Sequence, residues 1–322
     1  MSVEFILLVG LPGSGKSTYG LQLRTQMLID SIDTTMLSSD GIRKELYGDD
    51  AIQGNPKEVF NLMRERTINA LAAGTSVIYD ATNLTRKSRA SILQSIQENI
   101  NKGKISNNLT KKCHIIWNTI ENCVYLDGQR DGTVGEEVIL NMVRGFQTPT
   151  MEEGFDDIKI MQQGAYELPL LMAALSKVSH HDRHHGNSTV LDHSLAIIRL
   201  IGIMPILSMA KLVALAVVHD LGKIWTQSFD EEKQVTHFYG HENVSAYVIL
   251  GLSTLDMFDT STSKLHMSFL ANNHMQPFNQ SKWFKRNADA VTKSLLTKFT
   301  EFEQMAMEWE RKHFPYYETK ND

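Results

Sequence analysis

Cysteine and long apolar runs are both scarce in this sequence. Only two cysteines, Cys113 and Cys123, occur in 322 residues, so a disulfide framework is excluded and both are expected to be free thiols in a reducing compartment. No apolar run is long enough to span a membrane. The run from Phe5 to Val9 is short and leads directly into a glycine-rich loop, which predicts a buried strand rather than a targeting segment. These absences predict a cytoplasmic protein, of a cell or of a phage-infected host.

An excess of positive charge is also missing. Lys and Arg number 32 against 37 Asp and Glu, for a formal net charge of −5. Binding of nucleic acid through bulk positive charge is therefore excluded, and any such binding must use local basic patches. The sequence contains no internal repeat and no low-complexity tract. Its length and its 42% apolar residues are sufficient for two domains that each bury a core.

The first half of the chain alternates strand and helix patterns. This alternation predicts an α/β fold in which helices cover a parallel sheet. The segment from Pro56 illustrates the helix signals, since proline stands near its start and Gly74 just past its end. The predicted strands are Val3 to Val9, Thr34 to Ser38, Ser76 to Tyr79 and Cys113 to Trp117, and the predicted helices are Lys16 to about Leu28, Pro56 to Ala73, Thr85 to Ile100 and Val134 to Phe146.

The second half has helical spacing and almost no strand pattern. We place the boundary near Gly164, which gives an α/β domain over residues 1–164 and an all-α domain over residues 165–322. Lys211 to Val218 is nearly all apolar and is expected to be a buried helix. The charged and aromatic tail from Thr300 to Lys320 is expected to be a further helix.

A complete phosphate-loop pattern follows the first predicted strand. It reads Gly10-Leu-Pro-Gly13-Ser14-Gly15-Lys16-Ser17, with Thr18 next, and it precedes a predicted helix as the motif requires. The glycines let backbone N–H groups point into one concavity, and the helix N-terminus adds partial positive charge. Lys16 is expected to reach the outer phosphates of ATP and Ser17 to bind Mg²⁺. A chance glycine-rich turn would not show this context on both sides.

Acidic and basic residues follow the next two predicted strands. Asp40 and Arg43 lie three apart on one helix face, where Asp40 would accept the proton of an attacking hydroxyl and Arg43 would hold an acceptor phosphate. An N-cap aspartate with an exposed arginine fits the same pattern equally well. Asp80 ends the third strand and is a candidate partner of Mg²⁺. Arg130 precedes a helix and is a candidate lid arginine over the transferring phosphoryl group.

Three basic residues on the predicted helix Thr85 to Ile100, namely Arg86, Lys87 and Arg89, have two interpretations. They are placed to meet an anionic acceptor, or they form an ordinary solvated basic face.

This half resembles the phage-type polynucleotide kinases. The resemblance rests on the phosphate loop, Asp40-x-x-Arg43, Tyr79-Asp80-Ala-Thr82-Asn83 with Arg86, Cys123 through Arg130 to Val134, and Pro149 with Glu153-Gly154-Phe155. It implies that Asp40 is the general base, that Arg43 contacts the phosphate beside the accepting 5′-OH, and that Arg130 contacts ATP. One departure is the lid helix, where Tyr125 and Leu126 replace arginines that relatives often carry.

Histidines are concentrated in the second half. They include His193, the His219-Asp220 pair directly after the apolar segment, His241 and His274. Any one of them fits a hydrogen-bonded core histidine. Together, at helix-compatible positions and with one paired to an aspartate, they predict a metal site, because imidazole and carboxylate are common ligands and burial of both is costly without a partner.

The run His219-Asp220-Leu-Gly-Lys223 resembles the hallmark of HD-domain phosphohydrolases. The resemblance implies metal ligation by His193, His219 and Asp220, with a distant aspartate as the last ligand. We take Asp289 for that role ahead of Asp256 and Asp259. It further implies that His241 and His274 bind a second metal or the phosphate, and that Lys223 touches the scissile phosphate. The metal would be a transition ion such as Mn²⁺, Ni²⁺, Co²⁺ or Zn²⁺, which activates water.

A separate group of histidines precedes His193. Only His185 matches a position of the HD family; His180, His181 and His184 are interpreted as structural. A substrate-contacting loop and a surface metal site are the alternatives for the group.

The two halves together resemble bifunctional enzymes that heal nucleic-acid ends. Such an enzyme phosphorylates a 5′-OH with ATP and Mg²⁺ and removes a 3′-phosphate or 2′,3′-cyclic phosphate, so that an RNA or DNA ligase can act on the repaired ends. Two other hypotheses remain: a small-molecule or nucleoside kinase fused to a nucleotide phosphohydrolase, and a nucleotide-sensing domain that gates an HD hydrolase. The acidic net charge and the lack of a recognisable RNA-binding module weigh against the first hypothesis.

Overall fold

The computed structural model describes residues 3–50, 52–130, 132–203, 209–253 and 261–316. The chain divides into two compact units. Unit 1 consists of residues 1–143 and 148–165, and unit 2 of residues 144–147 and 166–322. The main division follows Ala165, beside the boundary expected near Gly164, and the short segment 144–147 belongs with the second unit although it lies within the first half of the sequence.

Unit 1 is built on a five-stranded sheet in which every pairing is parallel, as the alternating pattern predicts. The strands are β1 (Glu4–Val9), β2 (Thr34–Ser38), β3 (Ser76–Asp80), β4 (Thr110–Trp117) and β5 (Asp157–Gln162). Their order is β2-β3-β1-β4-β5. Strand β1 is therefore central, and its apolar run is buried on both faces of the sheet.

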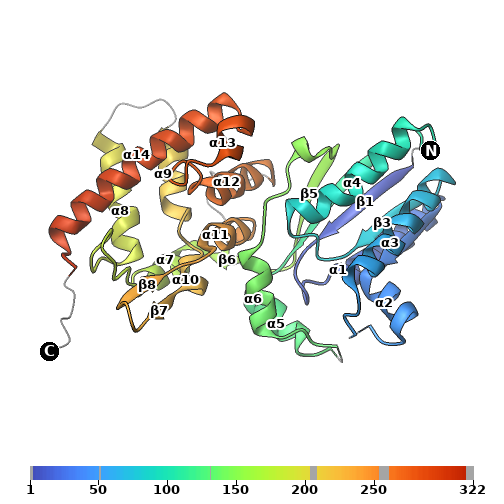
Figure 1. The fold of residues 1–322 in the computed structure, drawn as a ribbon, viewed down its shortest axis with the longest axis horizontal. Coiled ribbons are helices and arrows are strands. Elements are labelled where there is room, and N and C mark those ends of the chain that lie inside the picture. The colour runs from blue at the N-terminus through green and yellow to red at the C-terminus, as the bar shows by residue number, and fades with distance from the viewer. Residues whose placement is uncertain (1–2, 51, 131, 204–208, 254–260, 317–322) are drawn as a thin grey trace. The chain divides into compact units, whose positions relative to one another are not determined.

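The helices of unit 1 begin where the sequence offers capping groups. Side chains of Asn55, Thr85 and Thr119 accept hydrogen bonds from the first turns of three of them. Figure 1 shows these helices, in blue to green, beside the strands. They are α1 (Lys16–Ile29), α2 (Ser39–Tyr47), α3 (Pro56–Ala72), α4 (Arg86–Asn101), α5 (Ile120–Asp127) and α6 (Glu136–Arg144), with the short turn η1 (Met151–Glu153) after them.

The strand register brings the ends of three strands together. Asp80, the last residue of β3, pairs with Ser38 of β2 on one side and with Leu8 of β1 on the other. Parallel strands share one carboxyl edge, where ligands bind in open α/β sheets. The phosphate loop, Asp40 and Asp80 consequently start from the same edge of the sheet.

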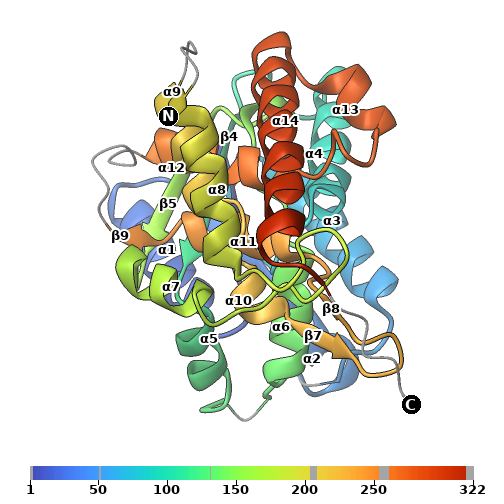
Figure 2. The same cartoon turned by 90° about the vertical axis from the view of Figure 1, so that its left-hand side faces the viewer.

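Unit 2 is mainly helical. Helix α8 packs against both α9 and α14, and α11 packs against α12; Figure 2 shows α8 and α14 running side by side. The helices are α7 (Leu168–Leu175), α8 (Val190–Ile203), α9 (Met209–Val218), α10 (Lys223–Thr226), α11 (His241–Ile249), α12 (Ser261–Asn273), α13 (Lys282–Asn287) and α14 (Ala290–His313).

Two short sheets in unit 2 depart from the all-α expectation. Strands β6 (Tyr166–Glu167) and β9 (Leu252–Ser253) pair in parallel, and β7 (Ser228–Asp230) and β8 (Val235–His237) form an antiparallel hairpin. With two or three residues each, these strands are too short to produce an alternating pattern. Across the described ranges, the structure has no helix with the length and apolar character needed to cross a membrane.

The expected basic face of α4 does not form. Arg89 is fully buried, its Nε and Nη2 donate to both carboxylate oxygens of Glu153 at 2.7 and 2.8 Å, and its Nη1 donates to the backbone carbonyls of Asn83 and Leu84. Arg86 turns toward Thr150 and Glu153, and Lys87 is exposed. The interpretation of Arg89 as an acceptor-binding residue was therefore wrong, because its guanidinium is used to fasten α4 to η1.

We predict that Arg89→Ala destabilises unit 1 by about 3–5 kcal/mol, because it removes both charged hydrogen bonds from the buried Glu153 carboxylate. Lys87→Ala, on the same helix but exposed, is the matched control and should change the free energy of unfolding by less than about 0.5 kcal/mol. Urea unfolding followed by tryptophan fluorescence measures both, since the buried Trp117 reports on unit 1. Equal effects of the two substitutions would contradict a buried ion pair.

Candidate functional site

The phosphate loop has the backbone that its glycines predict. Gly13 and Gly15 have φ of 73° and 90°, which favours glycine. A Cβ on Gly13 would lie 2.1 Å from the Cys123 carbonyl oxygen, so α5 packs directly on the loop and leaves no room for a side chain. Ser14 Oγ is buried and has no hydrogen-bond partner among the residues that the structure describes. A phosphate oxygen would supply that partner, and the loop thus fits the phosphates of a nucleotide.

Lys16 and Ser17 occupy the start of α1. Lys16 Nζ donates to the Leu11 carbonyl at 2.7 Å across the loop, and burial lowers the pKa of this lysine although Asp80 and Asp40 act against the shift. Ser17 Oγ donates to Asp80 Oδ2 at 2.8 Å. Burial raises the pKa of Asp80, and the charge of Lys16 and the hydrogen bond from Ser17 partly offset this shift. Ser17 and Asp80 thus form a hydroxyl and carboxylate pair of the kind that holds Mg²⁺ beside the phosphates; Thr18 is exposed next to them.

Asp40 is not the cap of its helix. Ser38 Oγ caps α2 by accepting from Gly41 N at 3.0 Å, which leaves the Asp40 carboxylate available for other contacts. Asp40 Oδ1 accepts from Arg43 Nη2, and its Oδ2 accepts from Arg130 Nη2 at 3.3 Å. Of the two interpretations of Asp40 and Arg43, the structure thus disfavours the N-cap. It brings three sequence-predicted residues into one contact network.

The lid arginine is held by a buried acid. Arg130 Nη1 lies 3.6 Å from Asp127 Oδ1, and Asp127 Oδ2 accepts from Thr133 Oγ1, Val134 N and Gly135 N. Burial works to raise the pKa of Asp127, but these hydrogen bonds and Arg130 hold it below its usual value. Asp127 was not predicted as a site residue, although it lies three residues before Arg130 on the lid.

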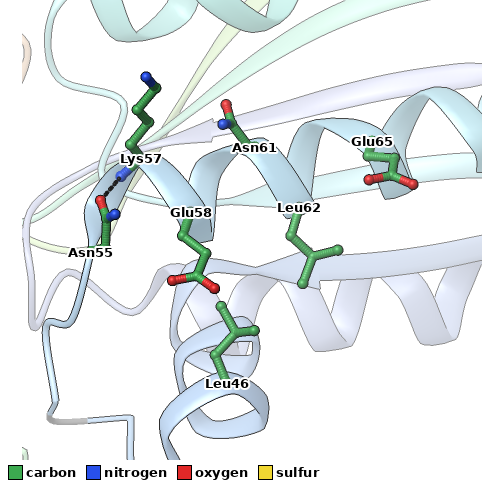
Figure 3. A pocket seen from close by; sticks show the side chains of 7 residues that line it. All are labelled: Leu46, Asn55, Lys57, Glu58, Asn61, Leu62 and Glu65. Atoms are coloured by element: carbon green, nitrogen blue, oxygen red, sulfur yellow. Dashed lines mark hydrogen bonds between the residues drawn. The ribbon is translucent and has the colours of Figure 1, made fainter.

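A hollow of about 520 Å³ lies elsewhere in unit 1, between α2 and α3. Figure 3 shows Leu46 and Leu62 facing each other across it, with Glu58 between the two helices. It opens beside the C-terminal half of α2, whereas Asp40 is near the N-terminus of that helix. None of the sequence-predicted site residues lines it, and its two glutamates do not suit an anionic ligand.

The histidines of unit 2 converge as the sequence predicts. His193, His219 and Asp220 have ligand atoms within 4.8 Å of one another, and so do Asp220, His241 and His274. Asp220 is common to both groups. His219 Nε2 lies 3.2 Å from its Oδ2, and His241 Nε2 lies 3.3 Å from its Oδ1. Four imidazoles are thus arranged around one buried carboxylate. They come from α8, from α11 and from the residues that directly follow α9 and α12.

Three of these four imidazoles are oriented by backbone carbonyls at their Nδ1 atoms. His219, His241 and His274 contact the carbonyls of Ala216, Phe238 and Ala271 at 3.1, 2.9 and 2.7 Å. A carbonyl oxygen only accepts, so Nδ1 carries the hydrogen and Nε2 presents a lone pair to the cluster. Metal-binding histidines are usually held in this manner.

Two imidazole nitrogen atoms in the cluster face each other. His241 Nε2 and His274 Nε2 are 3.3 Å apart. Burial, together with neighbouring His219 and His241, holds the pKa of His274 well below its usual value, so this ring is neutral. Where both nitrogen atoms present a lone pair, they repel at that distance unless a proton or a metal ion lies between them. His219 Nε2 and both Asp220 oxygens also lack a hydrogen bond of normal geometry. These residues therefore fit a divalent metal pair that shares Asp220.

The charges around Asp220 agree with this fit. Burial acts to raise the pKa of Asp220, but His219 and Lys223 hold it well below its usual value, so the carboxylate is ionised. Lys223 Nζ lies 2.8 Å from Asp220 Oδ2. An ionised carboxylate attracts cations, and the ammonium group of Lys223 is one that lies next to it.

Asp289 does not reach the cluster. It caps α14, where its two oxygens accept from Thr292 N at 2.9 Å and Thr292 Oγ1 at 2.6 Å. The acidic residue of α14 that lies at the cluster is Glu303, whose Oε1 is 3.7 Å from His219 Nε2. Fourteen residues of helix separate the two, about 21 Å at 1.5 Å per residue. Asp256 and Asp259, the other residues considered for the last ligand, lie outside the described residues.

Glu303 is buried and chemically unsatisfied. Within the described part of the chain, its Oε2 has no hydrogen-bond partner. Burial together with nearby Asp220 raises the pKa of Glu303 well above the usual value. A bound cation would reverse that shift, because it stabilises the ionised form. Glu303 was not predicted as a ligand, yet a signal existed in the sequence. It stands on the same helical stripe as the buried Phe299, Phe302 and Ala306, and a charged residue on the apolar face of a helix is unusual.

The part of the chain that matches a known family lies in its first half. Residues 5–149 match the AAA_33 family, described as an AAA domain. No curated protein sequence matches the chain. Among solved structures, a chain of the Pnkp1/Rnl/Hen1 RNA repair complex is 23% identical with a TM-score of 0.34, covering 48% of this chain and 47% of that one. This chain thus matches about half the length of that structure.

Two other solved structures show similar coverage of this chain. A fungal RNA kinase is 16% identical with a TM-score of 0.35, covering 50% of this chain and 75% of that one. A gluconokinase from Sinorhizobium meliloti is 15% identical with a TM-score of 0.31, covering 48% and 81%. The family match and the geometry of the phosphate loop identify unit 1 as an α/β domain with a nucleotide-binding P-loop.

Proposed function

We propose that this chain heals broken nucleic-acid ends, with one reaction assigned to each of its two units. Unit 1 would transfer the γ-phosphoryl group of ATP to a 5′-hydroxyl, and unit 2 would remove a 3′-phosphate or 2′,3′-cyclic phosphate. The observation that carries the proposal is that one chain holds both Asp40 between two arginines beside a phosphate loop and four imidazoles around Asp220.

The two reactions complement each other chemically. Cleavage of RNA through its 2′-hydroxyl leaves a 5′-hydroxyl on one fragment and a cyclic or terminal phosphate on the other. A ligase requires the opposite arrangement, a 5′-phosphate and a free 3′-hydroxyl. A chain that adds the first phosphate and removes the second prepares the break for an RNA or DNA ligase.

The kinase step assigns a role to each contact of Asp40. Its carboxylate accepts the proton as the 5′-hydroxyl oxygen attacks the γ-phosphorus and ADP departs. Arg43, 15% exposed in its side chain and adjacent to Asp40, would bind the phosphate next to the accepting hydroxyl. Arg130 would stabilise negative charge on the transferring group. Mg²⁺ held by Ser17 and Asp80 would neutralise charge on the nucleotide phosphates.

The hydrolytic step depends on the cluster around Asp220. Divalent ions held by His193, His219, Asp220, His241, His274 and Glu303 would supply a deprotonated water near neutral pH and charge stabilisation at the phosphorus. Lys223 would bind a non-bridging oxygen of the substrate phosphate. The Nδ1 contacts of the four histidines keep each ring oriented through the reaction.

Exposed aromatic rings beside this cluster favour a polynucleotide over a small metabolite. Tyr239 is 71% exposed, lies two residues before His241, and stacks on His237 with ring centroids 5.1 Å apart. Phe229, half exposed on β7, lies on the same hairpin. Aromatic rings at a phosphate site are suited to stacking the bases of a single strand. A few stacked nucleotides suffice for an end-acting enzyme, so a negative net charge does not prevent binding.

The direct test uses short RNA with a 5′-hydroxyl and either a 3′-phosphate or a 2′,3′-cyclic phosphate, incubated with ATP and Mg²⁺ or Mn²⁺. End healing requires a gain of 5′-phosphate and a loss of the 3′-terminal phosphate. A gain of 5′-phosphate without loss of the 3′-terminal phosphate would contradict the hydrolase activity proposed for unit 2. No change at either end, with ATP still bound, would favour the small-molecule or nucleotide-sensing hypotheses.

We predict that Asp40→Asn slows phosphoryl transfer to the 5′-hydroxyl on the order of 10²- to 10⁴-fold under saturating substrate, because the acceptor loses its general base. ATP binding, measured by calorimetry, should persist. Asp49→Asn, an exposed acid just beyond α2, is the matched control and should retain activity. A loss of ATP binding in the Asp40 variant would show that its carboxylate organises the nucleotide site instead.

We predict that His219→Ala abolishes removal of the 3′-terminal phosphate and leaves 5′ phosphorylation intact, because His219 belongs to unit 2 alone. His184→Ala replaces an exposed histidine of the same unit and should retain both activities. Both activities are measured on the same oligonucleotides. If His219→Ala also eliminated the kinase, the assignment of one reaction to each unit would be wrong.

We predict that Tyr239→Ala weakens the apparent affinity for an oligonucleotide with a 3′-phosphate, raising KM about 5- to 150-fold, the value of one stacked base at 1–3 kcal/mol. Hydrolysis of p-nitrophenyl phosphate, which has no base to stack, should not change. Val291→Ala, at an equally exposed apolar residue of α14, is the matched control. An equal effect on both substrates would argue for a structural role of Tyr239.

A further inference from the structure

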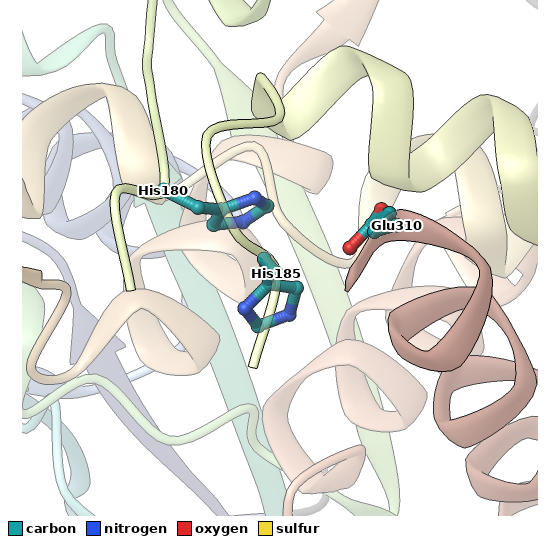
Figure 4. A group of neighbouring side chains, drawn as sticks. All are labelled: His180, His185 and Glu310. Carbon is teal, nitrogen blue, oxygen red and sulfur yellow. The ribbon is translucent and has the colours of Figure 1, made fainter. Parts of the chain in front are cut away.

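A third group of ligand-type side chains lies in unit 2 apart from the two that share Asp220. It consists of His180, His185 and Glu310, whose ligand atoms lie within 4.8 Å of one another. Figure 4 shows the Glu310 carboxylate, near the end of α14, directed toward the two imidazole rings. The rings of His180 and His185 are stacked with centroids 4.0 Å apart. From the sequence, His180 was interpreted as structural, with a surface metal site among the alternatives, and Glu310 was not considered.

Glu310 has an oxygen without a partner. The residue is fully buried, and its Oε1 lies 3.0 Å from His193 Nδ1. Its Oε2 has no hydrogen bond to any residue in the described ranges. Burial raises the pKa of Glu310 to about 9. A buried carboxyl oxygen without a donor is costly, and a metal ion would satisfy it.

The two histidines of the group are anchored as the other four are. His180 Nδ1 lies 3.2 Å from Ser188 Oγ, and His185 Nδ1 lies 3.1 Å from Asp182. In both rings the atom left to face the group is Nε2. Each imidazole thus has its Nδ1 occupied and its Nε2 directed inward, which is the usual state of a histidine ligand.

The loop that carries both histidines is tightly built. Asp182 Oδ1 accepts from the backbone N–H groups of His184 and His185, both at 2.7 Å. Asn187 N donates to the Phe314 carbonyl, just past α14, at 3.0 Å. A Cβ on Gly186 would lie 1.7 Å from that same carbonyl, so the loop rests directly on the end of the helix. This packing holds the two rings against Glu310 without any bound ion.

Lys223 competes with a cation for one ligand atom. Its Nζ donates to His180 Nε2 at 2.9 Å and also lies 2.8 Å from Asp220 Oδ2. A metal ion on His180 therefore requires the ammonium group to give up this contact and keep its contact with Asp220 or with a phosphate. The four-carbon side chain of lysine allows that movement.

We propose that His180, His185 and Glu310 bind a third divalent transition-metal ion. Two imidazoles and one carboxylate suit ions such as Zn²⁺, Mn²⁺ or Co²⁺, and three protein ligands leave coordination positions for water or a phosphate oxygen. Glu310 links this site to the first group through His193. The role of the ion as an additional charge beside the substrate phosphate rests on the proposed hydrolase, whereas the site itself rests on its three ligands.

Native mass spectrometry of the full chain titrated with Zn²⁺ or Mn²⁺, without nucleotide, counts the ions directly. The wild-type chain should bind three. Glu310→Gln and His185→Gln, each removing one ligand, should bind two, and His184→Gln, on the same loop but exposed, should bind three. Circular dichroism and thermal unfolding establish that each variant is folded. Agreement between the two ligand variants excludes a defect that is particular to one substitution.

Two further results decide the assignment. Lys223→Met removes the competing ammonium group, so its third ion should bind at a lower metal concentration than in the wild type. Two ions in the wild type, unchanged by Glu310→Gln and His185→Gln, would overturn the third site and leave the proposed hydrolase standing. Fewer than two ions in the wild type would overturn the third site together with the metal centre around Asp220. The effect of His219→Ala on removal of the 3′-terminal phosphate then tests the proposed hydrolase separately.

Discussion

Both candidate sites depend on burial of an apolar element directly before a polar group. Strand β1 ends at the phosphate loop, β3 ends at Asp80, and α9 leads into His219 and Asp220. An apolar segment packed in a core has a fixed end, so the group that follows it is held in place without a network of its own. The chemistry of each unit is therefore situated at the edge of its core.

The two sites differ in how much water reaches their central acids. The Asp40 side chain is 38% exposed, and its two arginine partners are accessible in part. A substrate can thus approach the Asp40 carboxylate and replace one of its contacts with an arginine. Asp220 is 2% exposed and surrounded by imidazoles. In such a low-dielectric environment an ionised carboxylate needs cations close by, which favours a site for metal ions over a site for a mobile acceptor.

Two buried acids on α14 lie beside imidazoles in the same way as Asp220. Glu303 and Glu310 are seven residues apart on the helix, so both lie on the stripe that faces α8. Each has one oxygen without a hydrogen bond. One helix thereby supplies a carboxylate to the cluster around Asp220 and another to the His180 and His185 group, and Asp289 at its start serves only as a cap.

Much of unit 1 could be predicted because its signals are local. The phosphate loop, the parallel α/β pattern and the strands that end at Ser38 and Asp80 all appear as short apolar runs followed by glycine or acid. Strand β5 was not predicted, since it is only partly buried and mixes polar and apolar residues. The role of Arg89 was also beyond local reasoning, because its partner Glu153 is 64 residues away.

The sequence by itself determined the phosphate loop, the Asp40 and Arg43 pair, and the set of histidines around His219 and Asp220, since each is a compact motif with its own chemistry. Only the tertiary structure decided which distant residues complete those motifs: Arg130 on Asp40, Glu303 in place of Asp289, and Glu310 against His180 and His185. The physical reason is that a helix such as α14 presents many acids at similar sequence distances, and only its packing against the core selects the few whose carboxylates are buried among the imidazoles.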